Sequence, residues 1–307
     1  MGRDSRRVGA SALLWAVCCL WPAASPAQDL TPRAYWPAPK GIKVAVVGYS
    51  YATGDVLFDP STPLYGVDSS INAGIVAYLQ TFSLWGRTTN VLVELPYSWG
   101  TTKGLLFADP ARRDFSGLGD LGLTLAVNLL GAPSMTPAQF QELRANPHPI
   151  LGASLKVVAP TGSYDSDRLI NVGANRWGVK AELGYMIPLR PKWLLELEAG
   201  VWFFGDDDDF LPGKREQEPI FAGDVHLVKR FKPGFWASLD LNYFTGGRQT
   251  IGGVRLGDVQ RNSRLGGTVV VPFRGRHAIK VGYSRGVVTE FGTDFRQFIV
   301  SYQTVFR

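Results

Sequence analysis

The stretch Phe298-Ile299-Val300-Ser301-Tyr302-Gln303-Thr304-Val305-Phe306-Arg307, at the end of the chain, decides the fold. Its apolar residues share one face of an extended strand, because side chains alternate in direction: Phe298, Val300, Tyr302 and Phe306. The other face is polar, with Gln297, Ser301 and Gln303. A strand that is apolar on one face, polar on the other and closed by an aromatic residue is typical of a transmembrane β-barrel. We expect the barrel assembly machinery to recognise the protein through this strand.

The other end of the chain predicts export. A basic region with Arg3, Arg6 and Arg7 precedes an apolar run from Val8 to Trp21. Small residues then predict signal cleavage after Ala27. The alternative is a transmembrane anchor, but the run is shorter than the ~20 apolar residues that span a bilayer. The chain thus divides into a signal peptide (1–27), a periplasmic N-terminal segment (28–40) and a barrel (41–307).

The composition supports a barrel and excludes several other classes. Both cysteines, Cys18 and Cys19, lie in the predicted signal peptide. The mature chain would therefore have no thiolate metal site, catalytic cysteine or disulfide. The mean hydropathy of 0.00 is too polar for a helical membrane protein and suits strands that face lipid and water alternately.

The same alternation recurs along the chain, so we predict an all-β, closed, antiparallel up-and-down transmembrane β-barrel of about 12 strands. The predicted strands are 41–53, 68–83, 88–99, 118–130, 150–160, 173–187, 192–204, 218–231, 235–246, 258–273, 276–288 and 294–306. The clearest lipid-facing series is Leu121, Leu123, Leu125, Val127 and Leu129. Such a barrel belongs in the outer membrane of a Gram-negative bacterium, with membrane lipid as one partner.

Tight and long connections alternate between these strands. The tight ones are 84–87, 189–192, 231–234 and 273–276, and the predicted long loops are 54–67, 100–117, 161–172, 205–217, 247–257 and 289–293. Short turns belong to the periplasmic side. One periplasmic connection, 131–149, is long. Thr136 and Pro137 there predict the start of a short helix, which we interpret as a lid or spacer.

The inward faces carry the candidate functional residues. By alternation, charged side chains of both signs form a lumen-facing wall: Glu94, Lys156, Arg176, Lys180, Glu182, Glu196, Glu198, Asp224, Asp240, Arg264 and Lys280. The same reasoning adds Lys43, Asp120 and Arg230. Charges inside a low-dielectric wall should pair, so one interpretation is an ion-paired network that fills the lumen. The other is a charged constriction that selects solutes.

Two finer expectations concern the same faces. The charged residues of strand 173–187 should lie opposite Glu196 and Glu198 of the next strand and pair with them. Glycines within strands should also face the lumen, where they relieve crowding: Gly74, Gly122, Gly152, Gly178, Gly184, Gly200, Gly266 and Gly282.

Catalysis, metal binding and nucleic-acid binding have weak support. His226 falls two residues from Asp224 on one face, but no serine or threonine stands out as a nucleophile. We therefore expect no enzyme and no cofactor. The acidic run Asp206–Asp209 could bind Ca²⁺, but Lys214 and Arg215 could equally neutralise it, and we predict no metal site. No basic–aromatic pattern indicates a nucleic-acid partner.

Several spaced strings resemble the outer-membrane transporter family of the meta-pathway of phenol degradation. They are 90–100 (NVLVELPYSWG), 175–177 (NRW), 200–204 (GVWFF), 215–217 (REQ), 243–248 (YFTGGR), 260–264 (QRNSR) and 283–286 (YSRG). The resemblance covers essentially the whole mature chain. It implies a Gram-negative outer-membrane barrel for aromatic or other hydrophobic solutes, and the family offers no catalytic residues to transfer.

Three functions compete on this basis. The leading hypothesis is an outer-membrane channel or transporter for small, aromatic or hydrophobic solutes. The alternatives are a structural outer-membrane barrel with a plugged lumen and, third, an outer-membrane enzyme. Conductance distinguishes the first from the second.

Overall fold

The computed structural model describes residues 31–306, except 57–64, 107–108, 169, 191, 212 and 291–293. The predicted signal peptide lies outside the described residues. No helix in the described part of the chain has the length and apolar character that a membrane-spanning helix requires.

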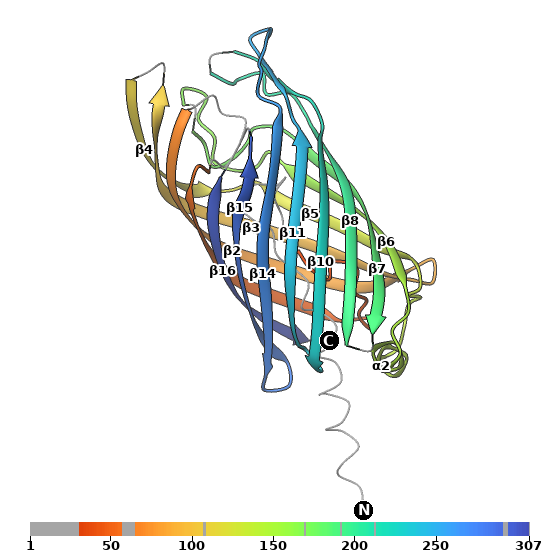
Figure 1. Ribbon diagram of the computed structural model, residues 1–307. Coiled ribbons are helices and arrows are strands. Elements are labelled where there is room, and N and C mark those ends of the chain that lie inside the picture. Colours follow the sequence, from red (N-terminus) through yellow and green to blue (C-terminus); the bar gives the residue numbers. More distant parts are fainter. Residues whose placement is uncertain are drawn as a thin grey trace, which may run out of the picture.

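The described chain forms a closed antiparallel barrel (Figure 1). Its strands are β1 (Lys43–Gly54), β2 (Tyr65–Leu84), β3 (Arg87–Leu106), β4 (Asp109–Leu118), β5 (Leu121–Leu130), β6 (Ile150–Ala159), β7 (Gly178–Arg190), β8 (Trp193–Phe204), β10 (Ile220–Lys232), β11 (Phe235–Gly246), β14 (Gln260–Phe273), β15 (His277–Thr289) and β16 (Phe295–Phe306). Successive strands pair, and β1 pairs with β16 along its whole length. Because β4 and β5 both pair with β3, they occupy one place in the wall. The prediction of a 12-stranded closed barrel is confirmed.

The ends of the barrel differ, and we name them by their connections. The inner end carries the tight turns, which face the periplasm in outer-membrane barrels. The end of β16 and helix α2 (Pro137–Ala145) lie at this end (Figure 1). The predicted helix is confirmed: the Thr136 hydroxyl accepts a hydrogen bond from the Gln139 N–H, and the Gln139 side chain accepts one from the Thr136 N–H. The outer end carries the longer connections.

Alternation sets the two faces of the wall as predicted. Leu121, Leu123 and Leu125 are exposed on the lipid face of β5, whereas Gly122 between them is buried. Two residues of the predicted inward set lie on the other face. Gly74 shares the outward face of β2 with the exposed Val76, and Lys43 shares that of β1 with Val47. In both strands, the residues adjacent in sequence point inward, so alternation places Gly74 and Lys43 on the outward face.

One predicted loop is wrong. Residues 100–106 and 109–117 belong to a hairpin in which β3 and β4 pair from Tyr97–Leu118 to Leu106–Asp109. The hairpin projects at the outer end (Figure 1). Outside the bilayer, neither face of a strand must be apolar, so the alternation that identifies membrane strands disappears there. The outer connections also form a small sheet of β9 (Arg215–Gln217), β12 (Gln249–Ile251) and β13 (Val254–Arg255).

The core of the molecule fills the inner end of the barrel. Apolar side chains from β1, β2 and α2 pack there with residues of the segment that precedes β1. We call that segment, residues 31–42, the N-terminal plug. Most of its side chains are buried, including those of Arg33, Tyr35 and Trp36.

Candidate functional site: the barrel lumen

The N-terminal plug contacts the barrel wall through a tyrosine. The Tyr35 hydroxyl lies 2.9 Å from Glu182 Oε1 and 3.0 Å from Ser154 Oγ. Its ring lies against two glycines of neighbouring strands. A Cβ atom at Gly152 or Gly184 would lie 2.2 or 2.1 Å from a ring carbon. These glycines therefore make the space that the plug occupies.

Backbone hydrogen bonds and aromatic stacking also hold the plug. The Arg33 N–H donates to Glu196 Oε2 at 2.5 Å, and the Asn128 side chain donates to the Tyr35 carbonyl at 3.2 Å. The Arg33 guanidinium lies 4.8 Å from the ring centre of Trp36 and 5.1 Å from that of Trp236. Sequence reasoning missed the plug because a short irregular segment has no periodicity. The close spacing of Tyr35 and Trp36 among prolines was the available signal.

Above the plug, the charged residues predicted on β3 and β6 meet across β5. Lys156 Nζ lies 2.7 Å from Glu94 Oε1, and both side chains are largely buried. The pair passes over Gly122, where a Cβ atom would lie 2.5 Å from Glu94 Oε1. Glycine at this position therefore lets two residues from non-adjacent strands form an ion pair.

The prediction that charged residues of β7 lie directly opposite Glu196 and Glu198 is wrong. In the observed register Glu182 faces Gly200, Glu198 faces Gly184 and Glu196 faces Met186. The stagger between β7 and β8 separates the charges that sequence position alone placed together. Instead, Lys180 forms an ion pair with Glu182 on its own strand.

Three carboxylates lie close together on the inward faces of β7, β8 and β10. Oxygens of Glu182, Glu198 and Asp224 lie within 4.8 Å of one another. Lys180 supplies positive charge beside this group through its ion pair with Glu182. The arrangement gives the lumen a local acidic patch.

A hydrogen-bonded chain continues the charged surface on β10, β11 and β14. His226 Nδ1 lies 2.9 Å from Asp240 Oδ1, and the Thr268 hydroxyl donates to Asp240 Oδ2 at 2.9 Å. Asn242 donates to Asp224 at 2.8 Å. Because Thr268 donates to the carboxylate rather than to the imidazole, this group lacks the nucleophile–base contact of a catalytic triad.

Three predicted site residues remain, namely Arg176, Arg264 and Lys280. They lie nearer the outer end or on the opposite side of the barrel. Arg176, just before β7, donates to Gln217 at 2.5 Å and lies over Phe204. Arg264 donates to Ser284 at 2.6 Å and lies 3.8 Å from the ring centre of Phe295. Lys280 is buried on the inward face of β15. Apart from Lys43, the predicted wall residues within described strands thus point inward.

The inward faces of β1 and β2 have the opposite character. Their described inward side chains carry no charge. The apolar ones are Val44, Val46, Ala52, Val67, Ile71, Ala73, Ile75, Ala77 and Leu79. In the strand order of the barrel, these two strands lie across from β7, β8 and β10. The lumen therefore has an apolar wall (β1–β2) and a charged wall (β7, β8 and β10).

Two apolar clusters line the outer half of the lumen. One contains Trp202, Ile220, Ala222 and Phe244, and the Trp202 ring stacks on Phe204 with centroids 6.1 Å apart. The other joins Ala52, Val56, Ile71, Phe115 and Phe295, with Ile170 and Val172 packed against it. Hydrophobic and aromatic linings with a few polar groups are usual for sites that bind small organic molecules.

The segment between β6 and β7 folds onto the second cluster. Asp120 anchors it by accepting hydrogen bonds from the Gly162 and Ala174 N–H groups, both at 2.8 Å. This segment also contacts the acidic run 206–209. There, Asp207 pairs with Arg215 at 3.1 Å. Lys214 contacts Asp206 at 2.8 Å, so basic neighbours neutralise the run, as one sequence alternative proposed.

Comparisons with known proteins agree with this architecture. A family model described as "Putative MetA-pathway of phenol degradation" matches residues 39–293, and the chain belongs to that family. An outer membrane channel from Pseudomonas putida F1 is 25% identical, with a TM-score of 0.75 over 91% of this chain and 100% of that chain. The β domain of the Bordetella autotransporter Brka is 12% identical, with a TM-score of 0.52 over 87% of this chain and 100% of that chain, and shares the fold. No curated protein sequence matches the chain. The protein is an outer-membrane β-barrel of a Gram-negative bacterium.

Proposed function

We propose that the protein is an outer-membrane channel for small hydrophobic solutes, in particular aromatic ones that carry a polar group. The division of the lumen into an apolar and a charged wall carries the proposal. A ring can bury its surface against β1–β2 while a hydroxyl or amino group hydrogen-bonds to carboxylates across the lumen. A channel for ions would instead place charges of one sign around its constriction.

The outer half of the lumen supports the same choice of solute. Its two clusters contain buried aromatic side chains, among them Trp202, Phe244 and Phe295, which a solute ring could replace as packing partners. Aromatic rings attract one another in offset or edge-to-face geometry beyond the burial of apolar area. The likeness to an outer membrane channel and the family's description are consistent with this solute class.

One observation favours the alternative of a structural barrel with a blocked lumen. The N-terminal plug packs into the apolar core at the inner end and leaves its large side chains buried. In the channel proposal, the plug moves or leaves a narrow path. In the structural proposal, it stays and nothing passes.

Uptake of a fluorescent hydrophobic amine, N-phenylnaphthylamine, by intact cells tests the proposal. Cells that express the protein should take up the probe faster than cells that lack it. The substitution Phe244→Gln, in the outer cluster, should reduce that gain by more than half. Tyr243→Gln is the matched control, because Tyr243 is the adjacent residue and is half exposed on the lipid face.

Each outcome selects one function. Faster uptake that depends on Phe244 but not on Tyr243 supports the hydrophobic channel. Uptake and single-channel conductance that both equal the background support the structural barrel. Heat-modifiable migration on unboiled gels confirms that each variant has closed its barrel, because complete backbone pairing resists detergent.

A further inference from the structure

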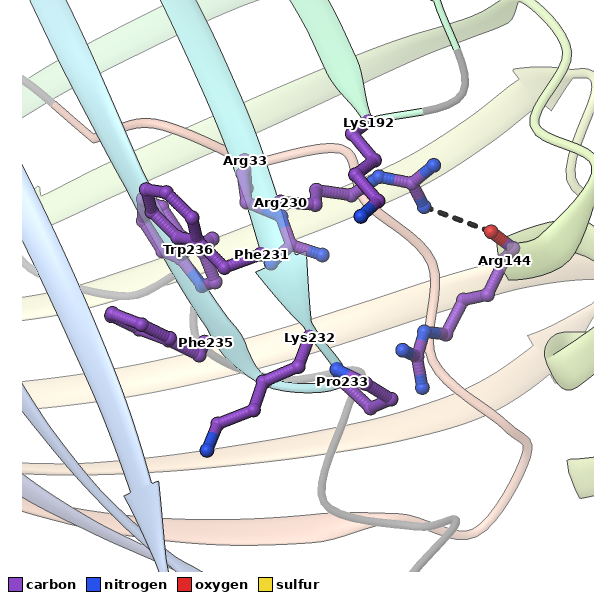
Figure 2. Close-up of a pocket in the computed structure, with 10 residues that line it drawn as sticks. Arg33, Arg144, Lys192, Arg230, Phe231, Lys232, Pro233, Phe235 and Trp236 are labelled. Atoms are coloured by element: carbon purple, nitrogen blue, oxygen red, sulfur yellow. Dashed lines mark hydrogen bonds between the residues drawn. The ribbon is translucent and has the colours of Figure 1, made fainter.

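A pocket of about 140 Å³ opens at the inner end of the barrel, beside the N-terminal plug (Figure 2). It is lined by side chains from the N-terminal plug, the end of α2, the β7–β8 turn and the β10–β11 turn. Five of the lining residues are basic: Arg33, Arg144, Lys192, Arg230 and Lys232. Among its described lining residues there is no aspartate or glutamate.

The basic side chains are held in place by contacts on several sides. Arg230 Nη1 donates to the Arg144 carbonyl at 3.0 Å, which fixes the strand end to the helix end. The Arg230 guanidinium also lies 5.3 Å from the ring centre of Trp36. Arg33 lies between the Trp36 and Trp236 rings. Figure 2 shows the labelled basic residues around the same opening.

The cluster opposes its own charge. Burial, together with the positive charges of Arg33 and Arg230, lowers the pKa of Arg144 to about 10. Arg33 has φ of 69°, a left-handed backbone conformation that costs a non-glycine residue energy. Strained residues of this kind concentrate at ligand clamps and switches. An anion within the pocket would offset the repulsion between these charges.

We propose that this pocket binds a phosphate group. Arginine presents planar, parallel donors that match phosphate oxygens, and lysine adds point charge. Two sources carry this chemistry at the inner end, namely a phospholipid headgroup of the inner leaflet and a soluble phosphate. Phe231 and Phe235 stack with ring centres 4.7 Å apart on the pocket wall, and Phe231 is exposed. They offer an apolar surface beside the cations.

Titration calorimetry on the protein in an uncharged detergent tests the proposal. Glycerol phosphate and a short-chain phosphatidylglycerol serve as probes. Saturable binding should weaken about tenfold or more in the Lys192→Gln/Lys232→Gln variant, because the loss of even one charge-assisted hydrogen bond is worth about a factor of ten. Both lysines are exposed at turns, so the variant should retain the fold.

The variant Arg274→Gln/Arg276→Gln is the matched control. It removes the same charge from another inner-end turn and touches no residue of the pocket. The control should bind as the unmodified protein does. Tighter binding of the phosphatidylglycerol assigns the site to a lipid, and equal binding assigns it to a soluble phosphate. No saturable binding of either probe, or an equal loss in the control, overturns the proposal.

Discussion

The two walls of the lumen are built on the same strand geometry but differ in chemistry. The β1–β2 wall presents valine, isoleucine, leucine and alanine, whereas β7, β8 and β10 present carboxylates, a lysine and a histidine. On both sides the inward residues alternate with lipid-facing ones. The difference teaches that inward does not mean polar in this barrel. A lumen with one charged and one apolar side can hold a molecule that has both polar and apolar groups.

The N-terminal plug uses both kinds of contact. Tyr35 reaches Glu182, on the charged wall. Trp36, Ala38 and Ile42 pack in the cluster that includes the inner part of the apolar wall. The plug is thus a built-in occupant whose polar and apolar groups match the two sides, and it indicates how a solute would be oriented.

The largest expected effect breaks the charged surface at its best-defined ion pair. Lys156→Met removes the positive charge that forms an ion pair with the buried Glu94 and should cost about 3–5 kcal/mol of unfolding free energy. Replacing both, in Glu94→Leu/Lys156→Met, should restore most of that stability. On the apolar wall, Leu79→Met keeps the side-chain volume and should cost less than about 1.5 kcal/mol.

Unfolding by urea in lipid vesicles measures all three variants. A single variant as stable as the double variant would mean that water, rather than the ion pair, stabilises Glu94. The two walls would then differ in polarity but not in their dependence on ion pairing for stability.

A smaller effect is expected where the charged wall meets the plug. Gly184→Ala puts a methyl group within 2.1 Å of the Tyr35 ring and should cost about 1–3 kcal/mol by overpacking. It should also displace the plug and raise single-channel conductance. Gly282→Ala is the control, because the nearest heavy atom to its Cβ is 3.8 Å away. Equal conductance of both variants would show that Tyr35 does not close the path.

The smallest effect sharpens the comparison at the outer end of the apolar wall. Burial, and then the charge of Asp294, raises the pKa of Asp55 to about 6. The folded state therefore holds this proton more tightly than the unfolded state, so local stability is highest below about pH 4 and falls as the pH rises through 6. Since Asp55 is partly exposed, we expect a loss of about 1 kcal/mol or less.

Amide exchange at Asp55, whose N–H donates to the Asp294 carbonyl at 2.9 Å, measures this loss. Its opening free energy should fall between pH 4.5 and 7.5 after correction for intrinsic exchange. In Asp55→Asn it should stay constant. A fall of the same size in the variant would assign the pH dependence to another group.

Alternation predicted the strands and most inward residues because lipid demands an apolar face over the membrane span. It also placed both members of the Glu94–Lys156 pair on the lumen side. It could not predict which β7 residues face Glu196 and Glu198, because the stagger of neighbouring strands depends on turn geometry and bulges. A register shift between Pro188 and Arg190 lies at the turn that sets this stagger.

The features that the sequence did not predict lie where contact with lipid does not determine which residues are apolar. The β3–β4 hairpin lies beyond the membrane, so its polar residues carry no periodic signal. The apolar inward face of β1–β2 could not be predicted, because stretches with apolar residues on both faces do not alternate in polarity. Gly152 and Gly184 make the space for the Tyr35 ring. Their role is visible only in the folded barrel, where β6, β7 and the N-terminal plug come together.

Closure of the wall by β1 and β16 has a consequence for how fast the protein forms. These strands come from the two ends of the described barrel, so among the described strands theirs is the pairing with the largest sequence separation. Any partly assembled sheet has two open edges, which hydrocarbon does not tolerate. We therefore expect closure of this seam to be a slow step of biogenesis. Since the plug directly precedes β1, we expect it to enter the barrel together with the sealing of the wall.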